Sequence, residues 1–395
     1  MANVFDYLTW RADVPLSVDP FNDVDNLVLA QLSYTDFSGI VPGDWTRISL
    51  SDAARAFYSL HSREEIQADK SFTAKAPFLM DEMIQGARFE GTLLSRYVNE
   101  IDPEKGIQLS ALTYDLPDGT RYIAFRGTDG TVVGWKEDFN FSYLPETEGQ
   151  SRAVQYLNTS GADFRVPLRV GGHSKGGNLA MYAASFCEPE VQERILAVYS
   201  NDGPGFRMQV VKSREYEQIL PRIRSIIPDS SMIGMLLNNR AQPLVVKSSA
   251  AGMVQHDAFT WQIRRNRFEE TVLSDMSQVV SRTLSDWLCQ VSDEERANLI
   301  NTIFSLFEST GKDSFREIGE QGWKGVETMM NHFRSLPKEK QQEAFRLLTM
   351  LGMSSGMAAM DYLRNMAMGR REEQKAETGG GTVPFQIGTA EKGKG

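Results

Sequence analysis

The sequence predicts an α/β protein in which a mostly parallel sheet is flanked by helices and is followed by an all-helical C-terminal region. Three observations lead to this prediction. Antiparallel strand patterns occupy residues 88–140, strand and helix patterns alternate over 151–227, and the pattern is helical from 267 to 368. Alternating strands and helices are typical of parallel sheets, because each crossover between parallel strands needs a long connection.

The N-terminal part, residues 1–88, mixes short helical patterns with polar loops, and we expect it to pack on the sheet. Residues 89–266 are predicted to form the core domain. Its first strands alternate in polarity, and the sequence Leu116-Pro-Asp-Gly119 is typical of a hairpin turn between two of them. The strands expected in the core are 92–98, 107–114, 120–125, 168–171, 195–200 and 223–227.

Residues 267–370 form the predicted helical region, with breaks expected near residues 290, 311 and 336, where Ser, Gly and Pro interrupt the pattern. The last segment, 371–395, is rich in glycine and has almost no apolar residues, which predicts a disordered tail.

Composition excludes several classes of function. The net charge of −10 disfavours nucleic acid as a partner, because there is no basic excess to neutralise phosphates. No stretch resembles a signal peptide or a transmembrane helix, so a cytoplasmic location is expected. The two cysteines, Cys187 and Cys289, are far apart in helical contexts and are expected to be buried thiols. No metal site and no cofactor site is predicted.

The most informative motif is Gly172-His-Ser-Lys-Gly176, which follows an apolar run and opens onto a helical pattern. A serine at such a strand-to-helix turn stands exposed above the sheet, and the two glycines let the strand and the helix approach closely. The sequence therefore predicts that Ser174 is a nucleophile.

A serine hydroxyl needs a base, which is usually a histidine held by a carboxylate. The chain has four histidines, and we predict His256 as the base, because it lies in a loop after the last predicted strand. His173, next to the serine, is predicted to be a packing residue, since its side chain points away from the hydroxyl. His61 precedes the serine, and His332 lies in the helical region.

Two carboxylates compete for the role of the acid that orients His256. Asp229 follows the strand 223–227 and is favoured, because an acid after the penultimate strand is the commoner arrangement. Asp202, in Asp-Gly-Pro-Gly205, is the alternative, although this sequence is also typical of a turn. Both residues are expected at the carboxyl edge of the sheet, on the same side as Ser174.

An oxyanion formed at Ser174 needs two hydrogen-bond donors. The backbone amide of Lys175 is the first candidate, and the loop after the strand ending at Phe125 supplies the second, with Thr128 offering an amide and a hydroxyl. In the same loop, Arg126 is expected to play a structural role by binding carboxylates.

These motifs resemble those of the class 3 (fungal-type) lipases. Phe125-Arg-Gly-Thr128 is similar to their oxyanion strand end, Trp135-Lys-Glu-Asp138 to their Trp-x-x-Asp element, and Gly172-His-Ser-Lys-Gly176 to their serine motif. The longer form Gly-His-Ser-Lys-Gly-Gly-Asn-Leu-Ala is closer still to the Mbeg1-like proteins of bacteria, over roughly residues 25–262. The resemblance implies an α/β-hydrolase fold and serine hydrolase chemistry. One departure is Lys175, which replaces the usual apolar residue; we expect its side chain to face solvent, because only its amide is needed.

The predicted function is therefore hydrolysis of a carboxylic ester, either a small molecule or a lipid, through an acyl-enzyme. An acyltransferase, a thioesterase and a non-catalytic binding module that keeps the hydrolase fold remain alternatives. Contact with a lipid surface is a further possibility, the segment 135–157 is predicted to be a mobile lid, and the oligomeric state is left open.

Overall fold

The computed structural model describes residues 2–69, 71, 73–163 and 165–353. Within these residues the chain forms an eight-stranded sheet whose spatial order follows the chain order. The first four strands pair antiparallel, and β4 to β8 pair parallel. The strands are β1 (Ile48–Ser49), β2 (Leu93–Asp102), β3 (Ile107–Asp115), β4 (Arg121–Phe125), β5 (Leu168–His173), β6 (Ile195–Asn201), β7 (Ile223–Pro228) and β8 (Pro243–Val246).

A small antiparallel hairpin, β9 (Ile263–Arg264) and β10 (Arg267–Phe268), lies outside this sheet. The helices before it are α1 (Val4–Arg11), α2 (Asp23–Leu32), α3 (Leu50–Leu60), α4 (Arg63–Ala68), α5 (Leu79–Met83), α6 (Val132–Asn140), α7 (Glu148–Ser160), α8 (Lys175–Phe186), α9 (Pro189–Gln192), α10 (Met208–Val211) and α11 (Arg214–Ile219). Those after it are α12 (Asp275–Gln290), α13 (Asp293–Glu308), α14 (Phe315–Glu320) and α15 (Trp323–Ser335), and residues 338–353 are also helical. Short 3-10 turns are η1 (Ala76–Phe78), η2 (Leu220–Arg222), η3 (Gly252–His256) and η4 (Ala258–Thr260).

Every strand that the sequence predicts is present, and the turn at Leu116–Gly119 joins β3 to β4, with Gly119 at a φ of 78°. Two further strands of the sheet, β1 and β8, were not predicted. β1 has only two residues and β8 only four, which is too short for a pattern of alternating polarity to be read.

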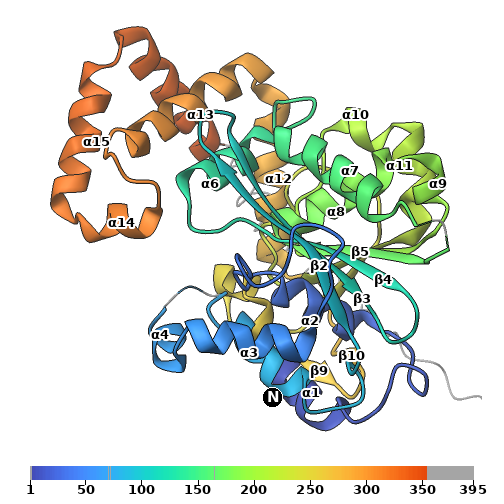
Figure 1. Cartoon of the computed structure of the whole chain (residues 1–395). Helices are drawn as coiled ribbons and strands as arrows, with labels where there is room; N and C mark the ends of the chain where they lie inside the picture. Colours follow the sequence, from blue (N-terminus) through green and yellow to red (C-terminus); the bar gives the residue numbers. More distant parts are fainter. Residues whose placement is uncertain (1, 70, 72, 164, 354–395) are drawn as a thin grey trace, which may run out of the picture.

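Helices cover both faces of the sheet, because its central strands are apolar on both sides (Figure 1). One core joins the N-terminal helices α1 to α3 to one face, through residues such as Tyr114 and Tyr122. The other core joins α7, α8 and α11 to the opposite face, through residues such as Ile123 and Val198. This arrangement confirms the predicted α/β-hydrolase-like sheet flanked by helices.

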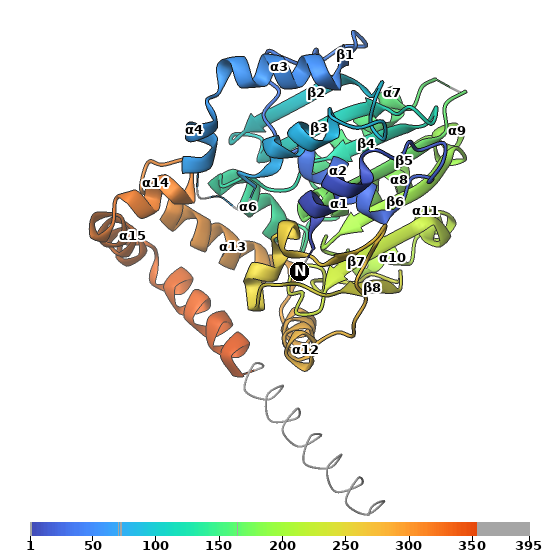
Figure 2. The same ribbon diagram turned by 90° about the horizontal axis from the view of Figure 1, so that it is seen from below.

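Helices α13, α14 and α15 lie at one side of the molecule, with α13 next to α6 (Figure 2). Helix α12 instead contacts the loop after β7, through the hydroxyls of Ser277 and Ser281. Ile300 and Phe304 of α13 pack with Val132 of α6 in a separate apolar cluster. Helices begin at Asp275 and not at residue 267, because the chain first completes the β9–β10 hairpin. The predicted breaks near 290, 311 and 336 are confirmed by the ends of α12, α13 and α15.

The domain boundaries at 88, 266 and 370 stay predictions, and the predicted disordered tail, 371–395, lies outside the described residues. None of the helices in the described ranges combines the length and the apolar character needed to cross a bilayer. Cys187 is buried, but Cys289 is exposed, contrary to the expectation from its helical context.

Candidate active site

Ser174 lies at the sharp turn between β5 and α8, at the carboxyl edge of the parallel strands. Its φ of 57° and ψ of −131° form a strained conformation that non-glycine residues rarely adopt. Gly172 and Gly176 make the turn possible. A Cβ at Gly172 would lie 2.3 Å from the carbonyl carbon of Gly176, and one at Gly176 would lie 2.0 Å from the carbonyl oxygen of Phe125. The strand and the helix therefore approach each other as the motif predicts.

His256 ends the 3-10 turn η3, and its ring is paired with Asp202. The distance between His256 Nδ1 and Asp202 Oδ2 is 2.7 Å. Because a carboxylate oxygen accepts hydrogen bonds, Nδ1 carries the hydrogen, which leaves Nε2 of the neutral ring as an acceptor. This is the tautomer that a general base needs in order to take a proton from a serine.

Asp202 follows β6 directly and is completely buried. Its second oxygen, Oδ1, accepts hydrogen bonds from the Ser231 hydroxyl and, at 3.1 Å, from the backbone amide of Gly234. A Cβ at Gly234 would lie 2.5 Å from this oxygen, so a larger residue would push the loop away from the carboxylate. The loop after β7 therefore fixes the carboxylate with its other oxygen turned toward His256.

Asp229, the acid that the sequence favours, lies at the same edge of the sheet but has different contacts. Its carboxylate accepts a hydrogen bond from the Ser230 hydroxyl at 3.0 Å, and its backbone oxygen accepts one from the amide of Ser274. The structure thus brings His256 to Asp202, the alternative acid, and engages Asp229 with its own loop. The physical reason is that the chain after β7 turns so that Ser231 and Gly234, and not Asp229, face the end of β6.

His173, which the sequence assigned to packing, is in direct contact with His256. Its Nε2 lies 2.8 Å from the backbone oxygen of His256, and its Nδ1 lies 3.0 Å from the Tyr34 hydroxyl. A carbonyl oxygen only accepts, so Nε2 carries the hydrogen and Nδ1 accepts from Tyr34. Burial lowers the pKa of His173 to about 3, which keeps the ring neutral, and burial raises the pKa of Tyr34. The pair holds the backbone of His256 at the edge of the sheet.

The loop between β4 and α6 approaches the serine closely. A Cβ built on Gly127 would lie 3.0 Å from Ser174 Cβ and 2.5 Å from the backbone oxygen of His173, so this position accepts only a glycine without rearrangement. Arg126 donates to Asn99 at 3.1 Å and contacts Asp129 at 3.3 Å. These contacts fix the course of the loop that carries Thr128.

Thr128 is buried, and its hydroxyl donates to Asp138 Oδ2 at 2.5 Å. Desolvation raises the pKa of Asp138, whereas the nearby Lys175 ammonium and the Thr128 hydroxyl lower it. The net result is a pKa of about 7. While Asp138 is ionised, the Thr128 hydroxyl donates its hydrogen to Asp138, which leaves the backbone amide as the other donor of Thr128. The amide of Lys175 belongs to the first turn of α8, where amides have no partner within the helix.

The side chain of Lys175 was expected to face solvent, but it does not. It is buried, and its Nζ donates to the backbone oxygen of Gln108 at 2.7 Å and to Glu137 Oε2 at 3.0 Å. The expectation was wrong because Glu137 of α6 supplies a buried counter-charge. That partner lies 38 residues earlier in the chain and leaves no local signal.

The segment 135–157, predicted as a mobile lid, contains parts of two helices and the connection 141–147 between them. Its first part belongs to α6, which packs against α13. Its second part belongs to α7, whose Ala153 and Leu157 are completely buried in the core beneath the sheet. Residues 148–157 of the predicted lid therefore belong to a core helix, and mobility of the remainder stays a prediction.

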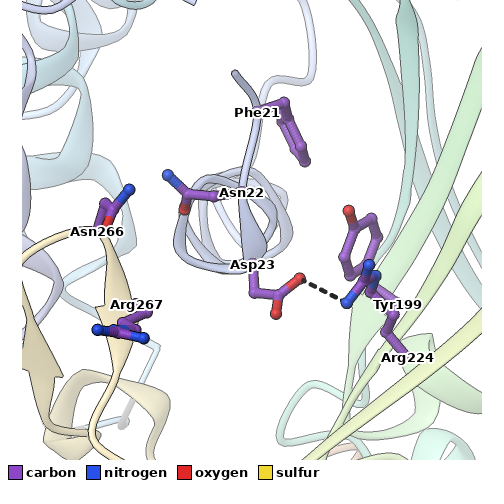
Figure 3. A pocket seen from close by; sticks show the side chains of 7 residues that line it. All are labelled: Phe21, Asn22, Asp23, Tyr199, Arg224, Asn266 and Arg267. Atoms are coloured by element: carbon purple, nitrogen blue, oxygen red, sulfur yellow. Dashed lines mark ion pairs between the residues drawn. The ribbon is translucent and has the colours of Figure 1, made fainter. Parts of the chain in front are cut away.

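Two neighbouring surface hollows lie away from Ser174, beside the N-terminus of α2. The first, of about 380 Å³, is lined by residues that include Phe21, Asp23 and Tyr199 (Figure 3). Asp23 is 3.7 Å from Arg224 there, so these charges already pair with each other. The second, of about 420 Å³, adjoins it and shares Asp23 and Arg224. Neither hollow is lined by Ser174 or His256.

Across the described ranges, no group of three His, Cys, Asp or Glu side chains is placed to hold a metal ion. Sequence reasoning missed the contacts that Tyr34 and Glu137 make at this site, and it predicted only packing for His173. A signal existed for Asp138, which ends the Trp-x-x-Asp element, but none distinguished Tyr34 from any other aromatic residue.

Comparison with known proteins identifies a family and a structural relative. The chain matches the Mbeg1-like family over residues 83–305, a range that contains Ser174, Asp202 and His256. Among solved structures, the crystal structure of M37 lipase is similar, with 13% sequence identity, a TM-score of 0.36, and coverage of 55% of this chain and 71% of that chain. No curated protein sequence matches the chain.

Proposed function

This chain belongs to the Mbeg1-like family, and we propose that it is a serine hydrolase that cleaves carboxylic esters through Ser174, His256 and Asp202. One observation carries the proposal. A buried carboxylate holds Nδ1 of His256 at 2.7 Å, at the sheet edge where a strained serine turn opens a helix. A serine, a histidine and a carboxylate in these roles form the constellation of acyl-transfer enzymes on unrelated folds.

The proposed reaction has two halves. In the first, Ser174 Oγ attacks the acyl carbon while His256 Nε2 takes the hydroxyl proton, which gives a tetrahedral oxyanion. The oxyanion collapses, the bond to the alcohol oxygen breaks, and the imidazolium returns its proton to the departing alcohol. In the second half, His256 takes a proton from water, the water oxygen attacks the acyl-enzyme, and Ser174 is regenerated as the acid product leaves.

We assign Asp202 to orienting His256 and to stabilising the imidazolium that forms in each half, in place of Asp229. The contacts of Asp202 support this choice, because two segments of the chain converge on its carboxylate: Ser231 and Gly234 of the loop after β7 bind one oxygen, and His256 binds the other. Asp229 is left without a catalytic role in this proposal.

The oxyanion is proposed to bind the backbone amides of Lys175 and Thr128. The position of Gly127 against Ser174 supports this, because it brings the loop of Thr128 to the serine. Asp138 acts as a positioning residue, since its carboxylate holds the Thr128 hydroxyl at 2.5 Å. Donors fixed before the reaction stabilise the developing charge most effectively.

The substrate class is proposed to be an ester with an apolar acyl group, of a small molecule or a lipid. Met253 and Val254, which precede His256 in the same turn, are 67% and 63% exposed. Exposed apolar side chains next to the base provide a surface that an acyl chain covers favourably.

A panel of p-nitrophenyl esters from acetate to palmitate tests the proposal, with wild type compared with Ser174→Ala and His256→Gln. We expect turnover by the wild type, and losses of roughly 10⁴-fold or more in both variants. Butyrate and longer esters should exceed acetate in kcat/KM, because each buried methylene contributes about 0.8 kcal/mol. Equal turnover by wild type and Ser174→Ala, with both proteins folded, would refute the proposed chemistry.

A further inference from the structure

A buried ion pair joins the nucleophile turn to α6. Lys175 Nζ lies 3.0 Å from Glu137 Oε2, and the two side chains are 0% and 1% exposed. Replacing a buried ion pair with apolar residues of similar size is often neutral or stabilising, so stability alone is a weak reason for a chain to keep one. The position of the pair, between the serine turn and α6, points to a second reason for keeping it.

Glu137 is held from three other elements at once. Its Oε1 accepts the backbone amide of Gly149, the second residue of α7, at 2.8 Å, and its Oε2 accepts the amide of Gln108 in β3 at 3.2 Å as well as Lys175 Nζ. A Cβ at Gly149 would lie 2.2 Å from Oε1, so the start of α7 approaches the carboxylate as closely as only a glycine allows. The carboxylate therefore anchors α6 to β3, α7 and α8.

Both proposed oxyanion donors depend on the residues of this pair or their direct neighbours. Lys175 itself supplies one amide. Asp138, the residue after Glu137, holds the hydroxyl of Thr128, which supplies the other amide. The rotation and the distance of α6 relative to α8 thus set the separation of the two donors.

Resting on the proposed function above, we infer that the Lys175–Glu137 ion pair is a positioning pair that fixes the oxyanion site before substrate binds. The helical C-terminal region also contacts α6, but from the other side, through Val132 and through the surface pair of Lys136 with Glu308. Those contacts attach α6 to the helical C-terminal region, whereas the buried pair sets the position of α6 relative to the serine turn.

The test compares two variants that should fold with the wild-type enzyme. In Lys175→Met/Glu137→Gln both charges are removed together, and the glutamine oxygen can still accept the amide of Gly149. Its nitrogen replaces Oε2 and can donate to the Gln108 backbone oxygen that Lys175 leaves, but it no longer accepts the Gln108 amide. In Glu137→Asp the charges remain, but the side chain is one methylene shorter, so α6 must shift to keep the pair. Lys136→Met, on the same helix, is the matched control because it breaks only the surface pair with Glu308.

We expect kcat for p-nitrophenyl butyrate to fall roughly 10- to 100-fold in both variants, with KM within about 3-fold of wild type, because a small displacement of oxyanion donors acts on the transition state and not on substrate binding. The rate of labelling by a fluorophosphonate should fall in parallel, since attack at phosphorus uses the same donors. Lys136→Met should match wild type in both measurements.

A purely structural pair would behave differently. If either variant has the circular dichroism spectrum of the wild type and also its kcat, or loses activity through KM alone, the inference is overturned. Should the double variant fail to fold, Glu137→Asp decides, because it keeps the buried charges balanced. A wild-type enzyme that neither turns over esters nor reacts with the fluorophosphonate would remove the proposed function, and this inference with it.

Discussion

Replacing Asp202 with asparagine changes one atom of the side chain and keeps its size. The consequence follows from the contacts of the carboxylate. Oδ1 accepts from the Ser231 hydroxyl and the Gly234 amide, so the oxygen of an asparagine must take that side. Its NH2 group then faces His256 Nδ1, and a donor there forces the histidine hydrogen onto Nε2. In that tautomer the ring has no lone pair for the serine proton.

The magnitude follows from the loss of that tautomer. In serine proteases, the same substitution at the orienting acid lowers kcat about 10⁴-fold while the geometry is kept. At about 1.4 kcal/mol for each factor of ten, this corresponds to roughly 5 kcal/mol of transition-state stabilisation. Asp229→Asn should leave kcat within about 3-fold of wild type, because an asparagine oxygen can still accept the Ser230 hydroxyl.

Initial rates on p-nitrophenyl butyrate measure both variants, and thermal unfolding checks that each protein is folded. We expect Asp202→Asn to be folded, with a similar KM and a kcat reduced about 10⁴-fold. If Asp229→Asn lost activity on this scale while Asp202→Asn kept it within tenfold, the assignment of the acid from the contacts of His256 would be wrong.

Three further predictions concern the groups around the site. Tyr34→Phe removes the hydrogen bond to His173 Nδ1, worth about 1 kcal/mol, so kcat should fall roughly 3- to 10-fold in steady-state assays; an unchanged kcat would show that the pair does not position His256. Gly176→Ala places a Cβ 2.0 Å from the carbonyl oxygen of Phe125 and should lower the free energy of unfolding in urea by ~3 kcal/mol or more. The control is Gly130→Ala, whose Cβ would have no atom within 4 Å beyond its chain neighbours, and it should change this free energy by less than about 1 kcal/mol. Burial raises the pKa of Asp138 from 3.8 to about 7, so the folded state binds more protons than the unfolded state between these values, and its contribution to stability falls as pH rises from about 4 to 7 and then levels off. Asp138→Asn should lack this fall when urea midpoints are compared at pH 5, 7 and 8, and parallel pH dependences in the two proteins would contradict the raised pKa.

Sequence reasoning found the features that local patterns encode. The turn at Ser174 was predictable because its glycines, the preceding strand and the following helix are contiguous in the chain. The strands of the core were predictable for the same reason, since each carries its own pattern of apolar residues within a few consecutive positions.

The choice between Asp202 and Asp229 was not predictable in this way. Both follow parallel strands and reach the same edge of the sheet, and only the path of the loop after β7 decides which of them faces His256. That path depends on the contacts of Gly234 with Asp202, which join residues 32 positions apart.

The buried position of Lys175 was hidden for a related reason. A lysine next to a helix start is ordinarily exposed, and only the docking of α6 brings Glu137 to its Nζ. Long-range pairs of this kind are formed by packing between helices and strands, so the sequence alone does not reveal them.

The most direct test of the central claim is covalent labelling of the purified protein by a fluorophosphonate, with the modified residue located by mass spectrometry. We expect a single phosphonyl adduct on Ser174, no adduct in Ser174→Ala, and a rate of labelling that falls steeply in His256→Gln. An adduct on another residue, or a folded wild-type protein that stays unlabelled while Ser174 is accessible to the reagent, would contradict that claim.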